Sequence, residues 1–172
     1  MPKVEWKSDQ PVTGTATLSY GGPDPTTISG SGTLIGFRYT QIDGSHKVEP
    51  VSTADCRRYE IDPATPMNAP LSKSGALSPE DPDFDFLRSF LTAPDVRLPA
   101  GMWDVSALAQ FTEGDCGPGG HSMAATVRVT VTDCSAVRRR STYPYASRDE
   151  PRSHRRAPRD PLVGPRLYGL DP

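Results

Sequence analysis

The amino-acid sequence predicts a mainly β protein: a β-sandwich domain with one short helix, followed by an extended or disordered C-terminal tail. Two stretches alternate apolar and polar residues over eight positions or more, which is the pattern of half-buried strands. Nineteen prolines and fifteen glycines among 172 residues favour short elements joined by many turns. Residues 138–172 hold nine arginines and few aliphatic side chains, too few to support folding of this segment alone.

The clearest strand signals lie between residues 98 and 132. The first places five apolar side chains on one side of a strand: Trp103, Val105, Ala107, Ala109 and Phe111. After a loop rich in Gly and Pro, a second strand repeats the pattern with Met123, Ala125, Val127, Val129 and Val131. The two stretches predict a hairpin of strands over residues 102–111 and 122–131, with one apolar face directed at the core.

The first half of the chain predicts further, shorter strands, over residues 13–20, 33–42 and 47–53, with a few extended residues near Tyr59 and Ile61. Asp43-Gly44 is a strong hairpin signal after the second of these strands. Pro50 confines the third strand to an edge or a bulge, because proline cannot donate to the ladder.

The segment between these strands and the hairpin predicts a long connection and then a helix. Residues 62–80 contain four prolines and form the connection. Asp81 is the expected N-cap, with Pro82 at the first helical position, where its missing N–H costs nothing. We expect an amphipathic helix from about 82 to 91 that packs over one end or edge of the sheet, with an apolar stripe formed by Phe84, Phe86, Leu87, Phe90 and Leu91.

Charge and composition divide the chain into a domain, residues 1–135, and a tail, residues 136–172. Residues 1–137 hold 10 Lys/Arg and 17 Asp/Glu, a net charge of −7, whereas residues 138–172 hold 9 Arg and 4 Asp/Glu, a net charge of +5. No apolar run is long enough to predict a membrane span. The first eleven residues lack the apolar segment of a secretory signal, which predicts either a cytoplasmic protein or a domain separated from its export signal.

The three cysteines constrain the pairing of any disulfide. The predicted hairpin places Cys116 at its loop and Cys134 at its open end, and ten strand residues span about 33 Å. A disulfide needs Cα atoms within about 7 Å, so these two cysteines do not pair. Cys56 can pair with either, and we favour Cys116. The alternative is three free thiols in a reducing compartment.

The sequence offers no catalytic or metal-binding constellation. Asp115, Cys116 and His121 lie in one loop, but their spacing matches no zinc motif. Glu113 and Asp115 supply only two nearby carboxylates, too few for a calcium site. Because nucleophile and phosphate-binding motifs are also absent, we expect no enzyme activity, no metal and no cofactor.

Candidate contact residues fall into two groups. In the domain they are loop residues at the ends of strands, where binding residues concentrate: His46, Glu113, Asp115 and His121. In the tail they are basic and aromatic residues suited to phosphates and bases: Arg138, Arg139, Arg140, Tyr143, Tyr145, Arg155 and Arg156. Acidic residues dilute the tail and the domain is acidic, so we favour a solvated arm, or one that docks on a neighbouring subunit, over nucleic-acid binding.

The segment Pro99–Ala107, PAGMWDVSA, resembles the approach to the penultimate strand of bacterial immunoglobulin-like and PKD-like β-sandwiches, and Val127–Asp133, VRVTVTD, resembles their last strand. This resemblance implies an immunoglobulin-like β-sandwich. It also implies a module of secreted or cell-surface proteins that acts in adhesion, spacing, or carbohydrate or protein binding.

Together these observations favour a non-catalytic binding or structural module at the cell surface or envelope, with a protein or carbohydrate ligand. The first alternative is an assembly component of a virion or other particle, in which the tail docks on neighbouring subunits. The second is a nucleic-acid-associated protein that uses the Arg-rich tail.

Overall fold

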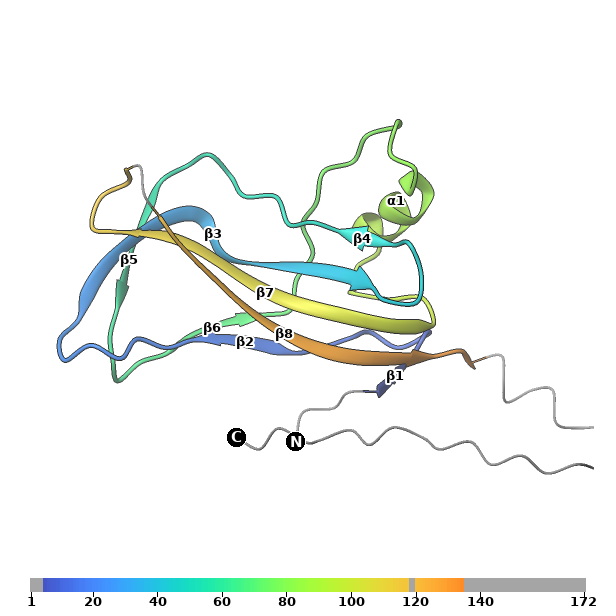
Figure 1. Ribbon diagram of the computed structural model, residues 1–172, viewed down its shortest axis with the longest axis horizontal. Coiled ribbons are helices and arrows are strands. Elements are labelled where there is room, and N and C mark those ends of the chain that lie inside the picture. The colour runs from blue at the N-terminus through green and yellow to red at the C-terminus, as the bar shows by residue number, and fades with distance from the viewer. Residues whose placement is uncertain (1–4, 118–119, 135–172) are drawn as a thin grey trace, which may run out of the picture. The chain divides into compact units, whose positions relative to one another are not determined.

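The computed structural model describes residues 5–117 and 120–134. This part of the chain is mainly β, with two sheets and one short helix (Figure 1). The main sheet has the strand order β1-β8-β7-β3-β4, and β5 also pairs with β3. Its strands are β1 (Glu5–Lys7), β3 (Thr26–Gln41), β4 (Lys47–Val48), β5 (Arg57–Ile61), β7 (Gly101–Glu113) and β8 (His121–Thr132).

The centre of the main sheet is the antiparallel trio β3, β7 and β8. Phe37 lies opposite Ala107, and Ala107 lies opposite Ala125, so the apolar residues of the three strands share one face. This face carries the core, in which Tyr39 and Trp103 are fully buried. The hairpin and the apolar faces predicted for residues 102–111 and 122–131 are therefore confirmed.

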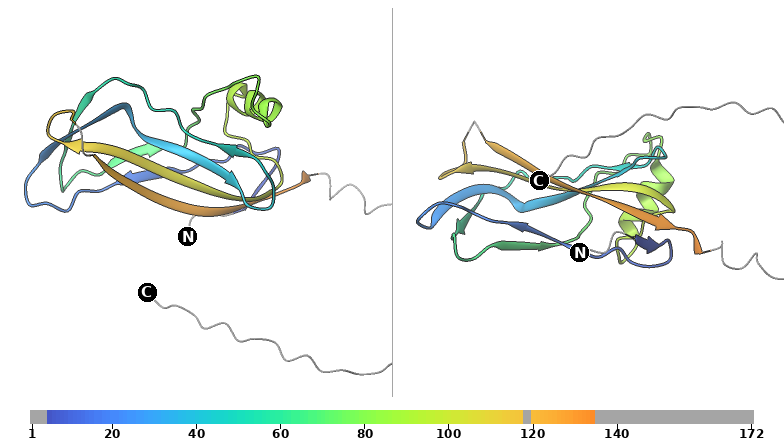
Figure 2. Two further views of the ribbon diagram at one scale, coloured as in Figure 1. Left: turned by 45° about the horizontal axis from the view of Figure 1, so that its top comes forward. Right: turned by 60° about the horizontal axis from the view of Figure 1, so that its bottom comes forward.

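A second, smaller sheet covers part of this apolar face. It consists of β2 (Thr15–Leu18) and β6 (Met67–Pro70), which pair antiparallel. Ala16 and Leu18 of β2 and Ala69 of β6 pack against the core, while the threonines of β2 are exposed. The two sheets form two layers, which Figure 2 shows from two sides. The prediction of a mainly β fold is thus confirmed.

The helix α1 (Phe84–Thr92) closes the core at the end of the molecule that carries β4 (Figure 1). The ring of Phe90 meets the ring of Tyr39 edge to face, with centroids 5.1 Å apart. Lys73 stabilises the C-terminal end of the helix, because its Nζ donates to the carbonyls of Phe90 (2.7 Å) and Ala93.

Several predicted elements need correction. The connection over residues 62–80 contains strand β6, whose short MNAP sequence has no alternating pattern long enough to predict it. The helix N-cap is Asp83 rather than Asp81; the Asp81 carboxylate instead accepts from the Ser78 amide at 2.9 Å. The strand predicted over residues 47–53 ends at Val48, two residues before Pro50.

The N-terminal strand β1 was not predicted at all. It pairs parallel with the last residues of β8, with Trp6 opposite Val131. Three residues are too few to show a period, so this strand is identified only by its pairing in the structure, where Trp6 is buried. The tail, residues 136–172, lies outside the described residues, and the domain boundary at residue 135 stays a prediction.

Candidate functional site

An apolar groove lies where the small sheet leaves the main sheet uncovered. Its volume is about 500 Å³. The floor comes from the inner face of β3, β7 and β8, and includes Ile35, Phe37, Val105, Ala107, Ala109, Met123, Ala125, Val127 and Val129. One wall is formed by β2 and the residues before it, from Val12 to Leu18. Among the residues that the structure describes, no charged side chain lines the groove.

The groove exists because the two layers differ in width. The small sheet has two strands, whereas three long strands form the opposite face. Ile35, Phe37 and Ala109 are buried, but Met123 and Val127 on β8 are 50% and 47% exposed. These two side chains belong to the core-facing side of their strand, and yet solvent reaches them. Half-exposed apolar side chains in a concave site are typical of a binding surface.

The wall formed by β2 offers free backbone groups. Leu71 N donates to Gly14 O at 2.9 Å, so the backbone of Gly14 points toward β6. Backbone groups alternate in direction along an antiparallel strand, and Pro70, opposite Thr15, has no N–H to donate. The N–H and C=O groups of Thr15 and Thr17 therefore point away from β6, at the edge of β2 that pairs with no other described strand.

The opposite side of the groove is a second strand edge. β1 pairs only with residues Thr130–Thr132 of β8. Within the described residues, β8 has no strand partner on that side from His121 to Val129. The groove thus lies between β2 and β8, each of which has an edge without a strand partner in the part of the chain that the structure describes. Such an edge is a template for pairing with another extended chain.

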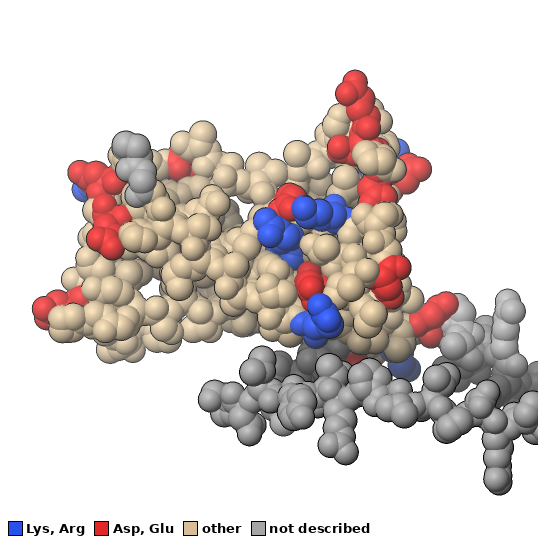
Figure 3. Space-filling model, in the orientation of Figure 1, with Lys and Arg blue, Asp and Glu red and all other residues tan. Residues whose placement is uncertain are grey.

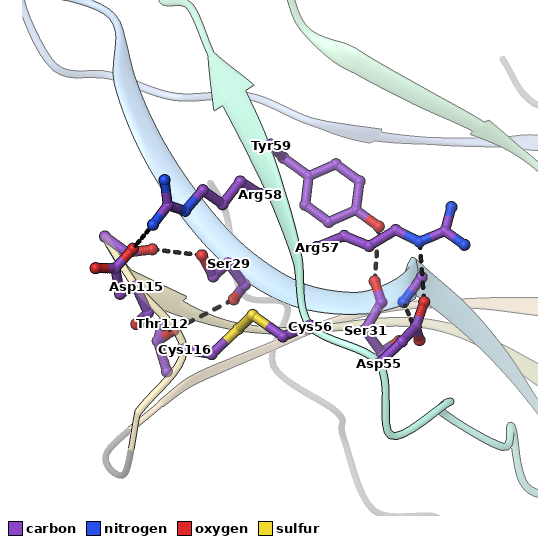
Figure 4. Close-up of a disulfide and its surroundings, with 12 residues drawn as sticks. Ser29, Ser31, Asp55, Cys56, Arg57, Arg58, Tyr59, Thr112, Asp115 and Cys116 are labelled. Atoms are coloured by element: carbon purple, nitrogen blue, oxygen red, sulfur yellow. Dashed lines mark hydrogen bonds and ion pairs between the residues drawn. A yellow bond between two sulfur atoms is a disulfide. The ribbon is translucent and has the colours of Figure 1, made fainter.

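A disulfide lies at the end of the main sheet where β5 begins and β7 ends. Cys56, directly before β5, is bonded to Cys116 in the loop after β7, with Cα atoms 6.2 Å apart. This is the pairing favoured from the sequence. Figure 4 shows the ion pair between Arg58 and Asp115 beside it. The Ser29 hydroxyl donates to the carbonyl of Gly114 in the same loop. The disulfide and these contacts hold the β7–β8 loop against β5 and β3.

Asp55 orders the segment that enters this disulfide. Its carboxylate accepts from the Thr53 hydroxyl and from Gly32 N at 2.9 Å. It also accepts from Arg57 Nε at 2.9 Å (Figure 4). The Thr53 hydrogen bond, followed by those of Gly32 and Arg57, lowers the pKa of Asp55 to about 2. Asp55 therefore remains ionised at neutral pH. Its hydrogen bonds to Gly32, Thr53 and Arg57 order the backbone on both sides of Cys56.

The four loop residues predicted to contact a ligand do not form one site. Glu113 and His121 lie together, with Oε1 and Nε2 3.3 Å apart, and Asp115 pairs with Arg58 nearby. His46 lies at the opposite end of the molecule. Its ring stacks on Phe86 with centroids 4.1 Å apart, and its Nδ1 is 3.1 Å from Asp83 Oδ2. These contacts give His46 a structural role in holding the helix.

On the face drawn in Figure 3, acidic side chains gather at the end of the domain that carries the helix, whereas charges of both signs lie over the middle of the sheet. Basic and acidic side chains lie beside each other, as in the pairs of Arg38 with Glu49 and of Arg128 with Asp104.

The seven predicted tail contacts, from Arg138 to Arg156, lie outside the described residues. In residues 5–117 and 120–134, no group of three or more metal-ligating side chains occurs. Within the same ranges, no helix has the length and apolarity to cross a membrane.

Comparison with known protein families, with curated proteins and with solved structures finds no match for this chain. The geometry of the groove is therefore the basis for a functional assignment.

Sequence reasoning missed the groove although it identified the residues of its floor. Met123 and Val127 were assigned to a buried face, because alternation predicts only which side of a strand is apolar. The signal that could have revealed their exposure is the small number of strands left for the opposite layer. With β6 hidden in a proline-rich connection, this count was not apparent.

Proposed function

We propose that this chain is a non-catalytic binding module with an immunoglobulin-like β-sandwich, and that its groove binds an extended polypeptide strand. The observation that carries the proposal is the apolar groove between the free edges of β2 and β8. A strand that pairs with β2 would add a third strand to the small sheet. This is strand addition, in which main-chain hydrogen bonds supply affinity and pockets for alternate side chains supply specificity.

The immunoglobulin-like assignment is supported by the two packed layers and by the resemblance of the PAGMWDVSA segment. In a complete sandwich, both layers cover one another, whereas here the apolar face of β8 is half exposed. A bound strand would make the smaller layer wider and cover Met123 and Val127. The two-stranded width of the second layer thus supports the proposed ligand.

The chemistry of the groove favours a polypeptide over a carbohydrate. Its floor presents alkyl and aromatic side chains without a charged group, and its wall presents the backbone N–H and C=O groups of Thr15 and Thr17. A peptide in an extended conformation matches both, because its backbone pairs with the wall and every second side chain contacts the floor. A cell-surface or envelope location is supported by the Cys56–Cys116 disulfide, since disulfides persist in oxidising environments.

A peptide library tests the proposal. The full chain is immobilised and challenged with a displayed library of random peptides about a dozen residues long, enough to span the length of β8. We expect the selected peptides to alternate apolar and polar residues. Val127→Lys places a charge on the floor and should weaken their binding at least about tenfold, because burial of an unpaired ammonium is costly.

The matched control is Leu77→Lys, which replaces another apolar side chain, 43% exposed, outside the groove. This variant should bind the selected peptides as the wild type does. Equal loss in both variants, or no enrichment of peptides at all, would contradict the proposed function. Circular dichroism and thermal unfolding verify that both variants fold.

A further inference from the structure

We infer that two copies of this chain associate through the edge of β8, in an antiparallel register with Ala125 of one copy opposite Ala125 of the other. This interface goes beyond the proposed function, since a strand that pairs with β2 leaves the edge of β8 unoccupied. The inference depends on the exposure and composition of β8 and on how its residues match under a twofold rotation.

The middle of β8 is an exposed strand edge without protection. Every residue of the range 122–128 is exposed, including Met123 and Val127 on the apolar side. The range contains no proline and no glycine, and its one charged residue, Arg128, lies on the opposite side from the apolar residues. Other described strands carry the usual protection, because β6 ends in Pro70 and β5 contains two arginines and a glutamate. An exposed edge that lacks such residues is a template for pairing.

The backbone directions of β8 determine which of its residues can pair. Ser8 N donates to Thr132 O at 2.9 Å, so the carbonyl of Thr132 points to the side of β1. Directions alternate along a strand, so every second residue back from Thr132 points its N–H and C=O to the same side. Within the described residues, β1 pairs with β8 only from Thr130 onward. Four residues of the range 122–128 therefore direct their backbone groups to this edge: Ser122, Ala124, Thr126 and Arg128.

One antiparallel register matches two copies of this edge. The twofold axis is perpendicular to the sheet and passes between Ala125 and its equivalent. Ala124 then lies opposite Thr126 of the partner copy, and Ser122 lies opposite Arg128. Opposite residues whose backbone groups face each other exchange two hydrogen bonds in an antiparallel sheet, so all the edge-directed groups of the range 122–128 gain partners.

The side chains of the two copies also match in this register. Met123 lies opposite Val127 of the partner copy, so the half-exposed apolar side chains of each copy contact those of the other. Arg128 lies opposite Ser122, and hence no like charges meet across the axis. The Arg128 guanidinium is moreover paired with Asp104 at 3.0 Å. The partner copy thus contributes its Met123 and Val127 to a groove floor that is continuous across the two copies.

The size of the interface sets the strength of association. The range 122–128 is a single stretch of seven residues in each copy, fewer than the roughly 20–30 residues a side of a stable interface. We therefore expect a reversible dimer with a dissociation constant in the micromolar range. Sedimentation velocity of the full chain between about 1 μM and 1 mM should show conversion of monomer to dimer.

The variant Ala124→Pro tests whether the edge of β8 is the interface. Proline removes the edge-directed N–H of residue 124, and the N–H groups that pair with β7 belong to its neighbours and remain. We expect the dissociation constant to rise at least about tenfold, because each copy loses a hydrogen bond and the ring obstructs the other strand. The matched control is Ala76→Pro, an exposed position outside the strands, which should associate as the wild type does. Circular dichroism verifies that both variants fold.

Cysteine cross-linking tests the register. In a Cys134→Ser background, Ala125→Cys places two thiols across the axis with Cα atoms about 4.5 Å apart, within the range of a disulfide. The control Met123→Cys places its two thiols about 13 Å apart, because they are separated by four residues along the paired strands. With oxidised glutathione as the oxidant, we expect Ala125→Cys to form a covalent dimer at least about tenfold faster than Met123→Cys.

The outcomes are decisive without any peptide, so this inference and the proposed function fail separately. A chain that stays monomeric over the whole concentration range overturns the inference. Equal cross-linking of Ala125→Cys and Met123→Cys also overturns it, as does a folded Ala124→Pro variant that associates like the wild type. If Ala124→Pro does not fold, the two cysteine variants decide. Association that is weakened by Ala124→Pro and trapped selectively by Ala125→Cys supports the inference.

Discussion

Removal of the Cys56–Cys116 disulfide should lower the free energy of unfolding by about 4 kcal/mol. The bond joins residues 60 positions apart. In the chain-entropy model, closure of a loop of this length removes about 14 cal/mol/K from the unfolded chain, which at 25 °C gives that magnitude. The double variant Cys56→Ser/Cys116→Ser removes the constraint while it leaves the Arg58–Asp115 pair in place.

Urea unfolding provides the measurement. It is carried out in a Cys134→Ser background, because the remaining free thiol can exchange with the disulfide during unfolding. We expect a lower midpoint and a larger m value, since the unfolded chain without the cross-link exposes more surface. The Cys134→Ser parent should unfold within about 0.5 kcal/mol of the wild type. A loss below about 1 kcal/mol, with an unchanged m value, would refute the reasoning from the unfolded state.

Three further predictions concern single contacts. Tyr39→Phe should lower the free energy of unfolding by about 1 kcal/mol in chemical denaturation, because the buried hydroxyl donates to Ser72 O at 2.5 Å; no loss would mean that water replaces this bond. Gly101→Ala should lower the free energy of unfolding by about 1–3 kcal/mol, because Gly101 has φ +144° and an added Cβ would lie 2.7 Å from Gln41 Nε2. The control Gly21→Ala should lower it far less, because no atom lies within 4 Å of the position of its Cβ. Asp55→Asn should lower the melting temperature above pH 4, and the difference from the wild type should shrink as the pH falls toward 2. The reason is that the pKa of Asp55 is about 2 in the folded protein, below its unfolded value, so its contribution to stability is lost on protonation. A difference in melting temperature that is constant with pH would show that the ionised carboxylate is not its source.

The stabilising role of His46 illustrates a limit of local reasoning. Its position after Asp43-Gly44 in a polar turn favoured an exposed residue that could contact a ligand. In the structure, the ring lies between the turn and α1, stacked on Phe86 and paired with Asp83. These partners are 40 and 37 positions away in the sequence, and no local pattern relates a turn to a helix at that distance.

The sequence by itself determined the strands that alternate most clearly, their apolar faces and the turn at Asp43-Gly44. Strand length also excluded a Cys116–Cys134 bond, but it left two possible partners for Cys56, of which Cys116 was favoured and is the partner in the structure. These properties depend on local geometry: side chains alternate every two residues, and a strand advances by a known distance per residue.

Only the tertiary structure decided that the small sheet is two strands wide and that Met123 and Val127 are half exposed. The alternation along β8 is the same whether its apolar side faces a complete layer or an open groove. What covers that side depends on how many strands from distant parts of the chain assemble opposite it. The candidate site is therefore a property of layer width, which arises from long-range packing and leaves no mark in the period of any one strand.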